Sequence, residues 1–191
     1  MQIDILELLE ARIEKNSKLG NRSLGRDNYG QISNMAMPAG WVPGEQIDNF
    51  VGNSSYKQFH PATDKNVRLS FYYRGRRATA ISGQRFHAIL AEPCHLLSRK
   101  EIELLAEIIR DKSNQFDFRM QSARTEDING KRVLVVEGRY NEIEQDCRSM
   151  FIDAEPSTGT VVQEISYQAP KASFYRYYSQ AKGAMDSIQW K

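Results

Sequence analysis

Residues 128–140 read INGKRVLVVEGRY, and this stretch decides the fold of the chain. The Asn129-Gly130 pair supplies the positive φ angles that a tight two-residue hairpin turn requires. The run from Val133 to Val136 is apolar at consecutive positions, as in a central strand that is covered on both faces. The sequence therefore predicts an antiparallel hairpin here, with its second strand in the middle of a sheet.

Patterns on both sides extend this hairpin. Apolar residues at 116, 118 and 120, beginning with Phe116, alternate with polar residues at 117, 119 and 121, which is typical of a half-buried strand. Residues 148–153 and 161–167 predict a second hairpin across Ser157-Thr158-Gly159. We therefore expect a four-strand antiparallel meander over residues 116–168.

Helical patterns flank the meander. Ser98 and Glu101 form a capping box that opens a helix to about Lys112. A last helix follows Pro170, where aromatic and apolar residues recur every three or four positions. Residues 55–60 and 67–73 predict two earlier strands, and residues 75–97 are ambiguous. Because helices must cover at least one face of an antiparallel sheet, the expected fold class is α+β: an antiparallel β-sheet meander packed against helices, an α/β sandwich.

The first 34 residues differ in character from the rest of the chain. Residues 2–18 predict an amphipathic helix, which is additional to the sandwich, and residues 20–30 carry glycines typical of a linker. We therefore divide the chain into residues 1–34, the N-terminal helix and linker, and residues 35–191, a single α+β sandwich domain. The apolar side of the helix is expected to dock either on its own domain or on a partner.

Length, charge and cysteine content narrow the class of protein. The chain has 191 residues and a formal net charge of +2, which is too small to indicate nucleic acid or an anionic membrane as partner by itself. Its start is acidic, unlike a secretory signal, and no apolar run approaches the roughly 18 residues that span a bilayer. The two cysteines, Cys94 and Cys147, are typical of a protein in a reducing compartment, and one disulfide bond between them remains an alternative. We expect a cytoplasmic protein.

Residues that could carry catalysis or bind a metal are dispersed. His60, His87 and His95 lie far apart in sequence, and the adjacent Cys94 and His95 lack the ligand spacing of a structural zinc site. We therefore expect no metal and no cofactor. Acidic residues between 126 and 146 gather near turns, where they usually cap backbone N–H groups or stay hydrated. We expect no enzymatic activity, with Cys94 or Cys147 as nucleophile kept as an alternative.

One basic segment is a candidate binding surface. Residues 71–80, FYYRGRRATA, place tyrosines beside arginines, and Arg68 precedes them on the same predicted strand. Such a patch can stack bases and pair phosphates, and it can also meet an acidic protein surface. The candidate partner-binding residues are Arg68, Tyr72, Arg74, Arg76 and Arg77.

Three features in this order resemble the PsbP-like α+β sandwich superfamily. They are a Pro38-Ala-Gly-Trp41 opening, a helix followed by a meander with an Asn-Gly turn, and a closing helix that ends at Met185-Asp-Ser-Ile-Gln-Trp190. The resemblance covers residues 35–191 and is to a bacterial-type member, since the targeting segment of lumenal members is missing. It implies a domain that binds other proteins and has no common catalytic site. We expect a non-enzymatic protein-binding or adaptor domain with a protein partner. The alternative is a nucleic-acid-binding module that uses the Arg/Tyr patch around residues 68–77.

Overall fold

The computed structural model describes residues 29–50, 54–155 and 160–191. Three sequence predictions lie outside these residues: the amphipathic helix of residues 2–18, most of the linker, and the turn at Ser157-Thr158-Gly159.

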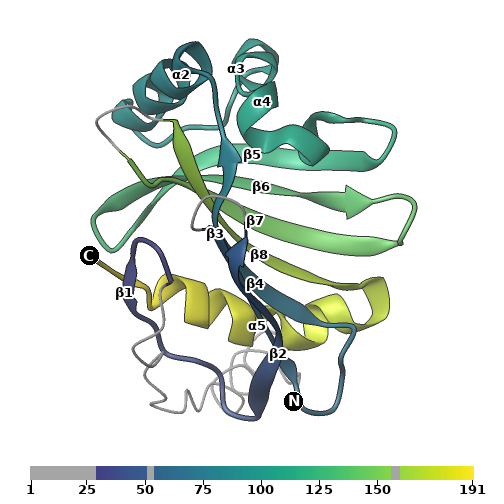
Figure 1. The fold of residues 1–191 in the computed structure, drawn as a ribbon. Helices are drawn as coiled ribbons and strands as arrows, with labels where there is room; N and C mark the ends of the chain where they lie inside the picture. The colour runs from purple at the N-terminus through teal and green to yellow at the C-terminus, as the bar shows by residue number, and fades with distance from the viewer. Residues whose placement is uncertain (1–28, 51–53, 156–159) are drawn as a thin grey trace, which may run out of the picture.

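A seven-stranded antiparallel sheet forms the middle layer of the fold (Figure 1). Its order is β2-β3-β4-β8-β7-β6-β5, so β8 pairs with both the first and the second half of the chain. The strands are β2 (Trp41–Phe50), β3 (Ser54–Pro61), β4 (Arg68–Arg77), β5 (Phe118–Ile128), β6 (Lys131–Tyr140), β7 (Gln145–Asp153) and β8 (Val161–Pro170). A separate two-stranded sheet pairs β1 (Ile32–Asn34) with β9 (Gln189–Trp190).

The predicted meander is confirmed as β5 to β8. Ile128 pairs with Lys131 across the predicted turn, where Asn129 and Gly130 have φ angles of 48° and 83°. Val133 to Val136 of β6 are all fully buried, as a strand covered on both faces requires. The prediction was wrong for Phe116, which is 85% exposed. Its N–H donates to the Asn114 side chain over 3.1 Å, so Phe116 lies in a turn and β5 begins only at Phe118.

The sequence predicted the helices only in part. They are α2 (Ala80–Ala91), α3 (Arg99–Leu104), α4 (Ala106–Ile109), the 3-10 helix η1 (Arg110–Ser113) and α5 (Lys171–Asp186). The capping box is confirmed, with Ser98 N–H donating to the Glu101 carboxylate over 2.7 Å. The single helix expected up to Lys112 is instead broken at Leu105, and again at Arg110, whose φ is 33°. The ambiguous segment 75–97 contains α2.

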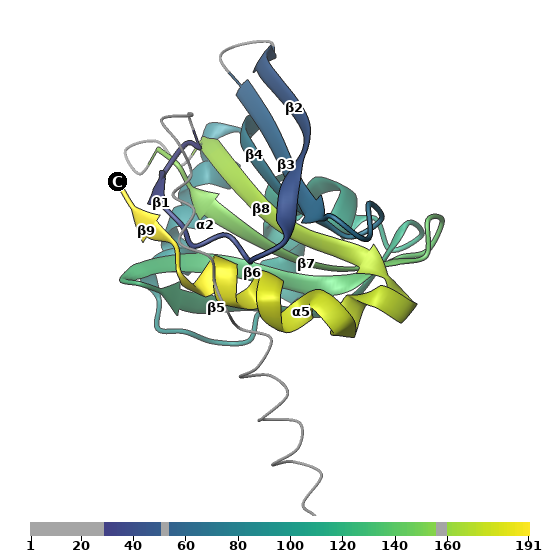
Figure 2. The same cartoon turned by 90° about the horizontal axis from the view of Figure 1, so that it is seen from below.

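Helices cover both faces of the sheet (Figures 1 and 2). On one face, here called the α5 face, Phe174, Tyr177 and Ala181 of α5 pack over Ile165 and Tyr167 of β8. On the opposite α2–α4 face, a second cluster joins α2, α4 and the loop before α3 to β5, β6, β7 and the start of β8. Its members are Phe86, Ile89, Leu97, Leu105, Ile108, Ile109, Phe118, Ala123, Leu134, Val136, Cys147, Phe151 and Val162. This packing gives the α+β sandwich that the sequence predicts.

Residues 29–34 belong to the packed part of the chain. Tyr29 and Ile32 are 5% and 3% exposed, and both lie in the cluster on the α5 face. The division of the chain near residue 34 stays a prediction for the preceding residues, but the described end of the predicted linker packs on the core.

The loop between α2 and α3 pairs with the outer strand β5. Leu97 N–H donates to the Ala123 carbonyl, and Thr125 N–H donates to the His95 carbonyl, each over 2.9 Å. Leu96 and Arg124 form an isolated antiparallel bridge between the same two segments. Residues 95–97 therefore lie along the outer edge of β5.

Candidate functional site

A polar cavity of about 270 Å³ opens on the α2–α4 face, on the half of the sheet built from β3, β4 and β8. Its lining comes from three strands of this half, from β6 and from η1: Tyr56, Ser70, Tyr72, Lys112, Tyr140, Glu164, Ser166 and Gln168. The apolar cluster under α2–α4 lies over β5, β6 and β7, so polar side chains occupy the remainder of this face.

Strand alternation explains why this half of the sheet is polar. In β4, Leu69 and Phe71 point into the core on the α5 face, so Ser70 and Tyr72 point to the opposite face. The pairing of β4 with β8 places Ser70 opposite Ser166 and Tyr72 opposite Glu164. Residues directly opposite each other in neighbouring strands share a face. The register therefore collects these side chains in one place.

A buried ion pair lies at the cavity. The Lys112 ammonium and the Glu164 carboxylate are 2.6 Å apart, and their side chains are 1% and 9% exposed. Lys112 also donates to the Tyr140 hydroxyl over 2.9 Å. Because desolvating two charges is costly, such a pair depends on close geometry and on further hydrogen bonds. Lys112 thus joins the helical layer to β6 and β8.

Tyrosines form much of the cavity wall. The rings of Tyr56 and Tyr72 meet edge to face at 6.1 Å between centroids, and the Tyr56 hydroxyl lies 3.1 Å from Ser70 Oγ. Both tyrosines are partly exposed. A tyrosine with one apolar and one polar end is well suited to a surface that is covered when a partner binds.

The five predicted partner-binding residues all lie on β4. Tyr72 lines the cavity, and Arg68 pairs with Gln168, another lining residue. Arg74, Arg76 and Arg77 lie in the last four residues of the strand, where Arg76 is opposite Val162 after a register shift. The sequence reasoning missed Tyr56, Lys112, Tyr140 and Glu164, because they join the site only through pairing between distant segments.

The two cysteines lack the properties of a nucleophile. Cys94 is exposed, and its Sγ lies 3.5 Å from the Asp127 carboxylate rather than beside an imidazole; desolvation and this hydrogen bond raise its pKa. Cys147 is buried, and burial raises its pKa as well. A cysteine nucleophile is activated by a lowered pKa, so neither thiol has the environment that this alternative requires.

Glu126, one of the acidic residues that the sequence placed near a turn, and Glu137 of β6 both pair with arginines. Arg148, only 1% exposed, donates to Glu137 over 2.6 Å and to Glu126 over 2.8 Å. Arg124 donates to the other oxygen of Glu137 over 2.7 Å. Burial acts to raise the pKa of Glu137, but hydrogen bonds from Arg124 and Arg148 outweigh it and lower the pKa to about 2. With every carboxylate paired to an arginine, this network ties β5, β6 and β7 together, and we assign it a structural role.

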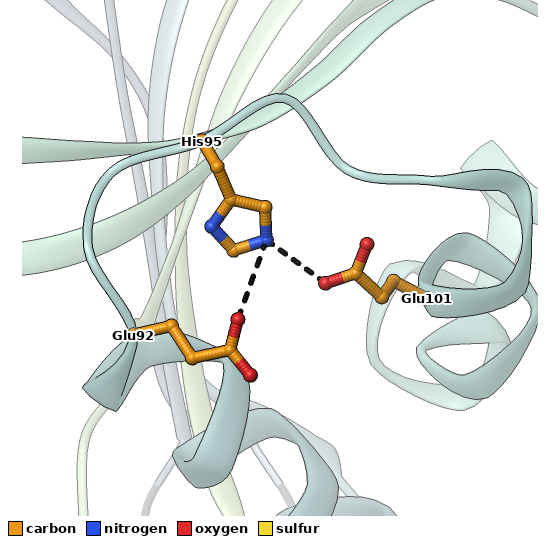
Figure 3. Close-up of side chains that lie close together, drawn as sticks. All are labelled: Glu92, His95 and Glu101. Atoms are coloured by element: carbon orange, nitrogen blue, oxygen red, sulfur yellow. Dashed lines mark hydrogen bonds and ion pairs between the residues drawn. The ribbon is translucent and has the colours of Figure 1, made fainter.

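The three histidines occupy separate environments. His60 Nδ1 lies 2.8 Å from the Pro61 carbonyl, and His87 lies 3.2 Å from the Asp153 carboxylate. His95 lies beside Glu92 and Glu101, a combination that provides three possible metal ligands (Figure 3). The sequence analysis considered His95 only together with Cys94.

None of the described helices is both long enough and apolar enough to cross a membrane. No family model and no curated protein sequence matches the chain. Among solved structures, the chain is similar to the solution structure of cyanobacterial PsbP (CyanoP) from Synechocystis sp. PCC 6803. The two are 10% identical, with a TM-score of 0.48 over 89% of this chain and 92% of the other. We assign no family, residue role or function from this likeness.

Proposed function

We propose that the chain is a non-enzymatic protein-binding or adaptor domain of the cytoplasm. Its binding surface consists of the polar cavity and the arginine-bearing strand β4, and its partner presents an acidic segment. The observation that carries the proposal is that Tyr72, which lines the cavity, lies on the same strand as Arg68, Arg74, Arg76 and Arg77.

The chemistry of the cavity supports a side chain rather than a large ligand as its occupant. Small-molecule sites usually enclose roughly 300–1,000 Å³ and are mostly apolar, whereas this cavity measures about 270 Å³ and is lined by hydroxyls, an amide and an ion pair. Because the charge of Lys112 is already balanced by Glu164, the attraction for an acidic partner comes from the arginines. Positive and negative surfaces that match in this way raise association rates and specificity.

A triple variant tests the role of the basic strand end. Arg74, Arg76 and Arg77 are changed to Ala in the tagged full-length chain, and a control triple variant changes the exposed Arg99, Arg119 and Arg176 to Ala, which removes the same charge. Proteins are captured on wild type from nuclease-treated extract, and the recovered partner is purified for titration. We expect the first variant to bind at least about 10-fold more weakly, the control to bind as wild type does, and both to keep the wild-type melting temperature.

The result also separates the two candidate functions. Equal affinity of wild type and the Arg74/Arg76/Arg77 variant for the captured partner would remove the patch from the proposal. Recovery that disappears after nuclease treatment, with affinity that falls steeply as salt rises, would favour the nucleic-acid-binding alternative, because phosphate contacts release counterions.

A further inference from the structure

Three side chains that commonly bind metals meet in the loop between α2 and α3 (Figure 3). His95 Nε2 lies 2.8 Å from Glu101 Oε1 and 3.9 Å from Glu92 Oε2. The three donor atoms all lie within 4.8 Å of one another. Nitrogen and oxygen ligands bind zinc at about 2.0–2.2 Å, which places two ligands of a tetrahedral ion roughly 3.4 Å apart. Each of the two measured separations therefore differs from that value by only about half an ångström.

Two of the three groups are already oriented by a second contact. His95 Nδ1 lies 2.8 Å from the Pro93 carbonyl, which can only accept a hydrogen bond. Nδ1 therefore carries a proton, and Nε2, which faces the two carboxylates, is the nitrogen that a metal ion would bind in place of a proton. Glu101 Oε2 accepts from the N–H and the hydroxyl of Ser98 over 2.7 and 2.6 Å, which leaves Oε1 facing His95. Outer contacts of this kind are typical of histidine and carboxylate ligands of metals.

The two carboxylates of the cluster have, among the described residues, no basic side chain beside them other than His95. Within the described part of the chain, no lysine or arginine lies at ion-pair distance from the carboxylate of Glu92 or Glu101. Arg132 donates to the backbone carbonyl of Glu92 rather than to its side chain. Two carboxylates thus face one imidazole, which is a set of ligand atoms that a divalent cation can bind.

We propose that Glu92, His95 and Glu101 bind one divalent transition-metal ion, with Zn²⁺ the best match. Imidazole nitrogen favours zinc and its first-row neighbours, whereas magnesium and calcium favour ligand sets made only of oxygen. Water would complete the coordination of a three-ligand site. The ion would connect the residue that ends α2 with the first turn of α3 and would fix the loop that lies along β5.

Zinc titration of the full-length chain tests the site. All proteins carry Cys94→Ser, because the exposed thiol directly before His95 could itself bind zinc. Isothermal titration with ZnCl₂ should give one ion per chain and a higher melting temperature, and CaCl₂ or MgCl₂ should give neither. His95→Gln should weaken zinc binding by at least about 100-fold, since loss of even an outer-shell partner costs roughly 10–100-fold. Glu92→Gln should weaken it by at least about 10-fold, and its side chain is 60% exposed, so this variant keeps the fold testable if His95→Gln unfolds.

Two matched variants separate a defined site from weak surface binding. His87→Gln removes an imidazole that has one carboxylate neighbour instead of two, and Glu103→Gln removes a carboxylate from the same helix, α3. Both should bind zinc as their parent does. Wild-type affinity in His95→Gln, an equal loss in the matched variants, or a parent that binds no zinc would overturn the proposal, as would equal binding of calcium. In those cases a protonated His95 between two carboxylates accounts for the cluster.

Discussion

Replacing Lys112 by Met tests the contribution of the buried ion pair at the cavity. Met keeps most of the length of the side chain, but it removes the ammonium, which lies 2.6 Å from Glu164 and 5.5 and 5.4 Å from the ring centroids of Tyr140 and Phe151. Removing one partner of a buried pair usually costs about 3–5 kcal/mol, because the remaining charge stays desolvated. Glu164 lines an open cavity and its side chain is 9% exposed, so we expect Lys112→Met to lower the free energy of unfolding by about 3 kcal/mol, the lower end of that range.

Urea unfolding followed by tryptophan fluorescence and circular dichroism measures this cost, provided that the m value is unchanged. The double variant Lys112→Met with Glu164→Gln should lose less stability than Lys112→Met alone, because no buried charge remains. Lys182→Met is the control: its pair with Asp186 is about 40% exposed, and such pairs contribute at most about 1 kcal/mol. A loss below about 1 kcal/mol in Lys112→Met, equal to that of the control, would refute the account of a desolvated pair.

Three further predictions concern packing, acid stability and thiol reactivity. Gly138→Ala should destabilise the fold by roughly 1–3 kcal/mol in urea unfolding, because its Cβ would lie 2.5 Å from a backbone oxygen of β5. Gly183→Ala should instead stabilise the fold by about 0.5–1 kcal/mol, because Gly183 lies inside α5 and an added Cβ there meets nothing within 4 Å. Folding lowers the pKa of Glu137 from 4.5 to about 2, so its contribution is complete above pH 4.5 and is lost as the pH falls toward 2. The free energy of unfolding of Glu137→Gln should therefore fall less steeply between pH 4.5 and 2 than that of wild type. An equally steep fall in both proteins would contradict a stabilising role of the ionised Glu137. In native protein at neutral pH, Cys94 should react slowly with a thiol reagent, and Cys147 should react only after unfolding, as peptide mass spectrometry can establish.

Elements with strong local signals could be predicted from the sequence. The hairpin at Asn129-Gly130 combines turn residues with alternating strands, and α5 combines a clear helical period with Pro170 at its start. The strand β2 was missed because Pro43 and Gly44 indicate a turn. Proline is tolerated there because β2 is the outer strand of the sheet and pairs only with β3.

The candidate sites depended on contacts that no local pattern contains. The cavity requires β4 to pair with β8, which brings Ser70 opposite Ser166, and it requires Lys112 to be buried rather than at the solvated end of a helix. Glu101 was identified as a capping residue and His95 as a neighbour of Cys94. Their meeting depends on how the loop between α2 and α3 folds back over β5, and the sequence gives no signal for that.

This loop also limits how the protein can associate with itself. An outer strand with free N–H and C=O groups can accept a strand from a second molecule, which is a route to fibrils. Residues 95–97 already occupy the hydrogen-bonding groups of Ala123 and Thr125, so that stretch of β5 offers no template. At the other edge of the sheet, the proline and the register shifts of β2 interrupt the regular ladder that an added strand would need. Each edge of the sheet is thereby interrupted over part of its length, one by a short loop and the other by irregularity of the strand itself, and this disfavours growth into an aggregate.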